Sequence, residues 1–243
     1  MSKLKAVILA AGKGTRMESD LPKVLHCVKN KPMVKYSIDA ARMAGAEEIC
    51  VIVGYKGEMV ADAIKDENVV IAEQKEQLGT GHAVKCARDF IGTEGSTLIL
   101  CGDTPLVRPE TLSMLADCHE KNGNSVTVLS AIFEDPTGYG RIIRDSEGDF
   151  LQITEQKDCT EEQKLVKEIN SGMYLYDSKA LYDALIKITN ENAQHEYYLT
   201  DTIELIKKAG MRVGAISVED KREILGVNTK VQLAEAEEIM SER

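Results

Sequence analysis

The chain has 243 residues, which is enough for one large α/β domain or two small ones. Its hydrophobic content of 43% and charged content of 29% are ordinary for a globular protein. The net charge of −10 argues against a broad electrostatic surface for nucleic acid, and no apolar stretch suits a membrane span or a signal peptide. We therefore expect a cytoplasmic protein that binds neither nucleic acid nor membranes.

The first half of the chain alternates strand-like and helix-like segments. Near-continuous apolar runs separated by helical patterns are typical of a parallel sheet with helices on both faces. Pro109 suits the first turn of a helix, and Gly45 suits the position just after one. The predicted strands are 4–10, 48–55, 68–73, 96–102 and 125–133, and the predicted helices are 33–44, 57–65, 80–91 and 109–121.

The pattern changes after residue 135. Residues 138–157 read as two short strands around a Ser-Glu-Gly-Asp turn, which predicts a hairpin. The simplest interpretation is one doubly wound domain whose second half resembles a lid. The remaining predicted elements are a strand at 170–178, helices at 179–188 and 198–209, a strand at 211–218 and a last helix at 229–243.

The six cysteines lie far apart with no C-x-x-C pair, and the four histidines form no metal-ligand doublet. This pattern suits reduced cytosolic thiols better than a disulfide framework or a zinc site. Each histidine, His82 included, is expected to be a surface or packing residue.

The segment LAAGKGTRM, residues 9–17, follows the first predicted strand and contains the glycine pair Gly12 and Gly14. A P-loop needs the pattern G-x-x-x-x-G-K-[ST], which is absent here. A dinucleotide fingerprint needs a third glycine, where Met17 stands, and a carboxylate after the second strand, which ends VIVGYKG. Both of these assignments therefore fail, and with them a dinucleotide oxidoreductase.

The same loop carries groups suited to another phosphate ligand. Gly12 and Gly14 let the backbone amides approach a polyphosphate. Arg16 offers a planar fork for phosphate oxygens, and Lys23 in the segment LPKVL adds a compact positive charge behind the stiffening Pro22. The alternative is a plain surface turn, but the combination of basic residues favours phosphate binding.

These two motifs resemble those of the sugar-phosphate nucleotidylyltransferases. Within that family, the resemblance is to the N-acetylglucosamine-1-phosphate uridyltransferase domain of bifunctional bacterial enzymes. Further matching segments occur in the family's order and span almost the whole chain. They are EQLGTGHAV (76–84), CGDTPL (101–106), DPTGYGRI (135–142), EQKD (155–158), EINSG (168–172), EYYLTD (196–201) and GVN (226–228).

The resemblance implies an α/β fold with a Rossmann-like doubly wound mixed sheet of the nucleotide-diphospho-sugar transferase type and a sugar-binding hairpin or lid region. Residues 1–228 would form the nucleotidylyltransferase domain, with 1–135 binding the nucleotide and 136–228 the sugar, and 229–243 would form a C-terminal helix. The bifunctional enzymes continue into a left-handed β-helix of hexapeptide repeats. No such repeat occurs in this chain, so acetyl transfer and a β-helix trimer are not expected.

The implied reaction joins UTP and N-acetylglucosamine 1-phosphate, releases pyrophosphate and uses Mg²⁺. Such transfer needs in-line positioning and charge neutralisation more than a protein nucleophile. The resemblance makes Arg16, Lys23 and Asp103 catalytic. The implied nucleotide-binding residues are Leu9, Ala10, Ala11, Gly12, Gly14, Lys23, Gln74, Gly79, Thr80 and Gly102.

Asp103 and Asn228 are the implied metal ligands. Asp103 follows the predicted strand 96–102, at the sheet edge where α/β proteins bind ligands, and Mg²⁺ prefers oxygen ligands. Taken alone, Asp103 would be a turn or helix-capping residue, and Asn228 would cap the last helix.

The resemblance implies two further groups of residues, one that contacts the base and one that contacts the sugar. Gln74 can both donate and accept, so it can read the imide edge of uracil, while Thr80 also suits a helix N-cap. The implied sugar contacts, which would otherwise be ordinary hairpin or strand residues, are Gly140, Glu155, Asn170 and Asn228. Tyr197 and Tyr198 either line the sugar pocket or belong to the core.

Two positions depart from the family pattern. Cys101 stands where some members carry tyrosine, which removes any contact from that ring, and His195 stands where glycine is expected. Two alternatives stay open: the same chemistry with another sugar phosphate or nucleotide, such as glucose 1-phosphate, and a nucleotide-sugar-binding module without turnover. No feature of the sequence predicts self-association.

Overall fold

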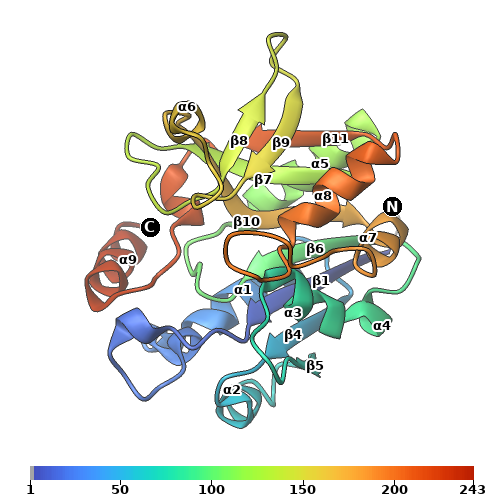
Figure 1. Cartoon of the computed structure of the whole chain (residues 1–243). Coiled ribbons are helices and arrows are strands. Elements are labelled where there is room, and N and C mark those ends of the chain that lie inside the picture. The colour runs from blue at the N-terminus through green and yellow to red at the C-terminus, as the bar shows by residue number, and fades with distance from the viewer. Residues whose placement is uncertain (1–2) are drawn as a thin grey trace.

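A computed structural model describes residues 3–243 of the chain. A nine-stranded mixed sheet runs through its centre, and a separate pair of short strands lies near the N-terminal loop (Figure 1). The strands of the main sheet are β1 (Leu4–Ala10), β4 (Glu48–Val53), β5 (Val70–Glu73), β6 (Ser96–Cys101), β7 (Val126–Ile132), β8 (Arg141–Arg144), β9 (Phe150–Thr154), β10 (Glu168–Asp177) and β11 (Val213–Ser217); the pair is β2 (Cys27–Val28) and β3 (Lys31–Pro32).

The helices largely follow the predicted segments, with one break and some additions. The predicted helix 80–91 is wrong as a single helix, because it divides at Ala87 into α3 and α4. None of the helices that residues 3–243 form could span a membrane. The α-helices are α1 (Met33–Met43), α2 (Gly57–Ala63), α3 (Thr80–Cys86), α4 (Arg88–Ile91), α5 (Pro109–Asn122), α6 (Glu161–Lys164), α7 (Ser178–Ala184), α8 (Thr200–Lys208) and α9 (Lys230–Glu242), and the 3₁₀ turns are η1 (Thr15–Met17), η2 (Lys23–Leu25) and η3 (Lys221–Ile224).

The strand order of the sheet is β11-β7-β10-β6-β1-β4-β5. Strand β1 pairs in parallel with β4 on one side and with β6 on the other. The direction of winding therefore reverses beside β1, so the loops that leave β1 and β6 diverge and leave a crevice at the carboxyl ends of these strands. The doubly wound mixed sheet is confirmed.

The strand β10 makes the sheet mixed, while the strands β1, β4, β5 and β6 of the first half pair in parallel as predicted. It runs antiparallel to both β6 and β7 and lies between them, so two strands of the first half are separated by a strand of the second. Its central residues are buried on both faces, as in a parallel strand, and such an apolar run does not reveal strand direction. The β8–β9 hairpin, which the Ser-Glu-Gly-Asp turn predicted, pairs with β10 through β8.

Alternate side chains of the central strands pack against two layers of helices. On β6, Leu98 and Leu100 belong to the core formed with α1, α2 and α5. Ile99, between them, belongs to the core formed with α3, α4, α7 and α8. All three side chains are buried, because successive residues of a strand point to opposite faces and both faces are covered.

A third hydrophobic cluster joins the N-terminal loop to the last helix. Met17 is fully buried there, together with Met33, Leu106, Val227 and Ala236 of α9. Figure 1 shows α9 lying beside the N-terminal segment that contains the short strands. Met17, which stands where the dinucleotide fingerprint needs a third glycine, therefore packs in this cluster and fixes the end of the glycine loop.

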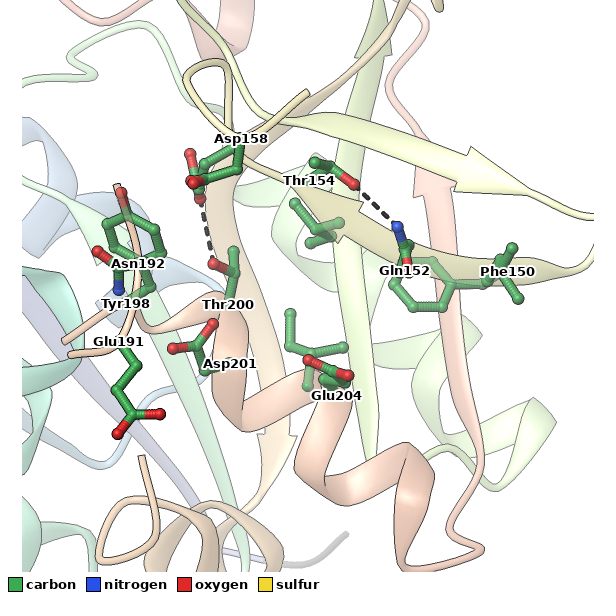
Figure 2. Close-up of a pocket in the computed structure, with 14 residues that line it drawn as sticks. Phe150, Gln152, Thr154, Asp158, Glu191, Asn192, Tyr198, Thr200, Asp201 and Glu204 are labelled. Atoms are coloured by element: carbon green, nitrogen blue, oxygen red, sulfur yellow. Dashed lines mark hydrogen bonds between the residues drawn. The ribbon is translucent and has the colours of Figure 1, made fainter. Parts of the chain in front are cut away.

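A cavity of about 290 Å³ lies between β9 and α8 (Figure 2). The carboxylates of Asp158, Asp201 and Glu204 line it. Burial, followed by the negative charge of Glu204, raises the pKa of Asp201 to about 6. Glu155 lies at the same cavity, where Thr200 Oγ1 donates to its Oε1 at 3.1 Å, and burial raises the pKa of its carboxyl group.

Ile99→Ala should destabilise the fold strongly, because Ile99 is fully buried against one helix layer and its loss leaves a cavity. We expect a loss of about 2–5 kcal/mol in the free energy of unfolding, measured by urea denaturation. The control is Ile132→Ala on β7, where the side chain is 59% exposed and the loss should stay below about 0.5 kcal/mol. Equal losses in the two variants would contradict this account of the core.

Asp201→Asn should raise the stability of the protein at neutral and alkaline pH. The pKa of about 6 in the folded state lies above the ordinary value, so the folded state favours the protonated carboxyl, and that contribution is lost as the pH rises through 6. The amide carries no charge to desolvate. We expect a gain in Tm on the order of 3–6 °C at pH 8 that shrinks toward pH 4.

The control for this comparison is Asp62→Asn on α2, because that carboxylate is 77% exposed. Its effect should be small at every pH. A gain for Asp201→Asn that is independent of pH would show that burial of the charge is not its cause.

Candidate functional site

A cavity of about 300 Å³ opens at the carboxyl ends of β1, β5 and β6. This is the crevice that the reversal of winding beside β1 creates. It brings together nine of the residues predicted to be catalytic or to bind nucleotide: Leu9, Ala10, Ala11, Gly12, Lys23, Gln74, Gly79, Thr80 and Asp103. Residues 80 positions apart in the sequence therefore share one cavity.

Two further predicted glycines support the walls of this cavity. Gly14 has a φ of 62°, and a Cβ there would lie 2.5 Å from Lys23 Cβ, so only glycine lets the loop approach this lysine. Gly102 N donates to Leu9 O at 2.9 Å, which joins the loop after β6 to β1. Both glycines hold the loops in place without lining the cavity themselves.

A cluster of charged and polar groups lies at the rim of the cavity. Lys23 Nζ forms an ion pair with Asp103 Oδ2 and donates to Asn228 Oδ1 at 2.9 Å. Arg16 Nη2 donates to the same Asn228 oxygen at 2.9 Å. The four predicted residues thus meet in one hydrogen-bonded cluster, although Lys23 and Asn228 are 205 positions apart.

The backbone explains why Asn228 reaches this cluster. Val227 N donates to Asp103 O at 2.9 Å, which fixes the GVN segment against the loop after β6. The N-cap of α9 is Thr229, whose hydroxyl accepts from Gln232 N, so Asn228 does not cap the helix. Asp103 likewise caps no helix, because the N-cap of α5 is Arg108.

Asp103 and Asn228 could together hold a metal ion. A Cβ on the intervening Gly226 would lie 3.7 Å from Asp103 Oδ2 and 3.6 Å from Asn228 Nδ2, so the two side chains face the same small space. A carboxylate and an amide oxygen suit Mg²⁺, which takes few protein ligands and fills its shell with phosphate and water. Within residues 3–243 no group of three or more His, Cys, Asp or Glu side chains is arranged for a metal.

Cys101 lines the cavity without a role as a nucleophile. Burial raises the pKa of its thiol to about 12, so the thiolate is scarce at neutral pH. Its sulfur lies 3.6 Å from Gly172 O, at the bulge of β10 between Asn170 and Tyr174. The cavity therefore abuts the segment that carries Asn170.

The residues predicted to contact sugar form a second group beside this bulge. Asn170 N donates to Gly140 O at 2.8 Å, and a Cβ on Gly140 would lie 3.3 Å from Glu155 Oε2. The Asn170 side chain donates to Tyr174 Oη at 2.7 Å and accepts from Gly172 N at 3.2 Å. Gly140, Glu155 and Asn170 are thus close together, and the fourth predicted residue, Asn228, belongs to the charged cluster instead.

The segment 196–200 joins the residues around the cavity to the group at Gly140, Glu155 and Asn170. No pattern in the sequence indicated these contacts. Gly81 N donates to Tyr197 O at 2.7 Å, and Leu199 N donates to Thr80 Oγ1 at 3.1 Å. Thr80 is therefore not the N-cap of α3, which is Gly79; its hydroxyl binds this segment instead. One residue further on, Thr200 donates to Glu155.

Two polar residues of this cavity were missed by the sequence reasoning. Gln77 and Glu196 line it, and both lie inside the quoted segments EQLGTGHAV and EYYLTD. Their polar side chains within segments that match the family were the signal that could have identified them as site residues. The neighbouring His195 has a φ of 55°, which is the left-handed conformation that the expected glycine would adopt without strain.

Comparisons with known proteins identify the family of the chain. Residues 5–222 match the family model described as Nucleotidyl transferase. The chain is 55% identical over 243 residues to the Bifunctional protein GlmU of Caldanaerobacter subterraneus subsp. tengcongensis, and 49% identical over 239 residues to that of Clostridioides difficile. The matches cover 100% and 98% of this chain but 53% and 52% of those proteins, so the chain spans about half the length of the curated relatives it matches.

A solved structure described as UDP-glucose pyrophosphorylase complexed with UDP-glucose has a TM-score of 0.79 to this chain, with 20% sequence identity. The alignment covers 100% of this chain and 99% of the other, which supports the fold. The family model matches most of the chain, and the relatives are similar over its whole length. The chain therefore belongs to the nucleotidyl transferase family.

Proposed function

We propose that this chain transfers a uridylyl group from UTP to N-acetylglucosamine 1-phosphate, forming UDP-N-acetylglucosamine and pyrophosphate. The observation that carries this proposal is the convergence of Lys23, Asp103 and Asn228 at the rim of a cavity lined by the glycine loop and Gln74. Basic groups next to oxygen ligands suit a reaction that depends on neutralising phosphate charge.

UTP would lie in the cavity of about 300 Å³ with its phosphates toward the charged cluster. The backbone of residues 9–12 would approach the phosphates, with Gly14 and Gly102 holding the loops in place. Gln74, Gly79 and Thr80 would bind the base at the other side of the cavity.

In the transfer step, an oxygen of the sugar phosphate attacks the α-phosphorus of UTP while the bond to the pyrophosphate breaks. Lys23 would neutralise charge on the α-phosphate, and Arg16 would hold the departing pyrophosphate. In the structure, both basic groups donate to Asn228, and Lys23 also pairs with Asp103. Phosphate oxygens would replace these partners when the nucleotide binds.

Asp103 and Asn228 are the residues that we assign to Mg²⁺. Bound there, the ion would neutralise negative charge on the phosphates. Asp103 faces the end of Lys23, so the carboxylate also sets the position of this catalytic cation.

The sugar would be bound by Gly140, Glu155 and Asn170, with Asn228 reaching its phosphate. Residues 136–228 would accordingly act as the sugar-binding half and residues 1–135 as the nucleotide-binding half of one domain. Because both substrates are metabolites of the cytoplasm, we propose that location for the protein.

Two other functions are less well supported. A different sugar phosphate or nucleotide, such as glucose 1-phosphate, would use the same charged cluster and would differ only around Gln74 and Asn170. A binding module without turnover has no need for Arg16, Lys23 and Asp103 to converge, yet these side chains meet in one cluster through Asn228.

The deciding experiment measures pyrophosphate release across a matrix of nucleoside triphosphates and sugar 1-phosphates, with and without Mg²⁺. We expect the highest rate for UTP with N-acetylglucosamine 1-phosphate and no release without a divalent cation. A preference for thymidine or guanosine triphosphate would overturn the uridylyl assignment. Absence of release with every pair would leave only the binding module.

Asp103→Ala should abolish turnover while leaving the fold intact, because it removes both a metal ligand and the partner of Lys23. We expect kcat to fall about 1,000-fold or more, with a circular dichroism spectrum like that of the wild type. The control is Asp62→Ala, an exposed carboxylate on α2, which should keep full activity. Near-normal Mg²⁺-dependent activity of Asp103→Ala would refute the metal assignment.

A further inference from the structure

The side-chain amide of Gln74 is held in one orientation. Gln74 follows β5, lines the nucleotide cavity and is 3% exposed. Its Nε2 donates to Gly79 O at 3.0 Å. A backbone carbonyl can only accept, so the group that faces it must be the NH₂ and not the oxygen of the amide.

His82 uses the second hydrogen of that NH₂ group. Its Nδ1 lies 3.1 Å from Gln74 Nε2. Because Nε2 can only donate, Nδ1 must accept, which places the proton of a neutral imidazole on its other nitrogen. The expectation that His82 is a surface or packing residue is therefore incomplete, since its ring is the second of two acceptors that hold the amide.

This arrangement leaves the amide oxygen for the cavity. Among the described residues none donates to Gln74 Oε1. Within residues 3–243, the fully buried side-chain atoms that lack a hydrogen-bond partner are His26 Nε2 and Arg141 Nε. Gln74 Oε1 also lacks a donor but is not among them, so this oxygen is accessible. Both N–H groups of the Gln74 amide are thus occupied, and its oxygen is a fixed acceptor at the cavity.

We propose that His82 is a positioning residue for base recognition: it holds Gln74 Oε1 toward the cavity and so selects a pyrimidine with N–H at position 3 over one with an unprotonated nitrogen there. Uracil has that N–H, and cytosine has a lone pair that would oppose the amide oxygen. This inference rests on the proposed function, in which the cavity holds the base of UTP.

His82 is well placed for this role because its own helix is fixed. Its ring centroid lies 6.2 Å from that of Tyr197, and the preceding Gly81 N donates to Tyr197 O at 2.7 Å. A Cβ on Gly81 would lie 2.9 Å from Tyr197 O, so the helix and this segment are in close contact. The imidazole therefore has little freedom to move away from Gln74.

The test compares kcat/KM for UTP and CTP in four variants. His82→Ala and His82→Phe remove the acceptor, and both should lower the UTP:CTP ratio roughly 5- to 10-fold, because the Gly79 carbonyl remains to hold the amide. His82→Asn can place an amide oxygen near the position of Nδ1 and should restore the ratio to within about 2-fold of wild type. Lys85→Ala, an exposed change on the same helix, should leave it unchanged.

A second measurement does not depend on turnover. In the ligand-free protein, NMR should show both Gln74 side-chain amide protons protected from solvent exchange, and one should lose protection in His82→Ala. If the wild type turns over no UTP, the proposed function fails, while these exchange rates and calorimetric binding of UTP and CTP still test His82. An unchanged UTP:CTP preference in His82→Ala and His82→Phe, or unchanged amide exchange, would overturn the inference.

Discussion

The rest of the structure depends on the position of β10 in the sheet. This strand arrives from the second half of the chain and forms antiparallel ladders with β6 on one side and β7 on the other. It therefore lies next to β6, which ends at Cys101, two residues before Asp103. Its bulge at Gly172, with a φ of 79°, places Asn170 beside the nucleotide cavity and turns the strand where Tyr174 can hold that amide. The pairing of β10 with β6 and β7 thus sets the distance between the two groups of site residues.

A short segment with little regular structure joins the two groups of site residues. Residues 196–200 contact α3 through Tyr197 and Leu199, and contact the hairpin through the Thr200 hydroxyl and Glu155. These hydrogen bonds attach one short segment to both groups of site residues. The carboxylates around α8 lie at the Thr200 end of this segment, where burial raises the pKa of Asp201 and Glu155.

Much of this architecture could be predicted because short-range patterns of apolar and turn residues indicate most of the strands and helices. The apolar run 4–10 is a strand to the residue, and the ends of parallel strands meet at one edge, which is why the glycine loop and Asp103 could be expected at the same edge. The direction of β10 could not be predicted, because its apolar run looks the same in either orientation. The roles of Thr80 and His82 also stayed hidden, since both depend on partners that no local pattern reveals.

The burial of Met17 ties the position of the glycine loop to a distant segment of the chain. The glycine loop lies at residues 9–17, yet the hydrophobic cluster that anchors it includes Val227 and Ala236. Asn228, which binds both basic side chains of the loop, comes from the same late segment. The glycine loop is therefore held in place only when residues far apart in the sequence pack together.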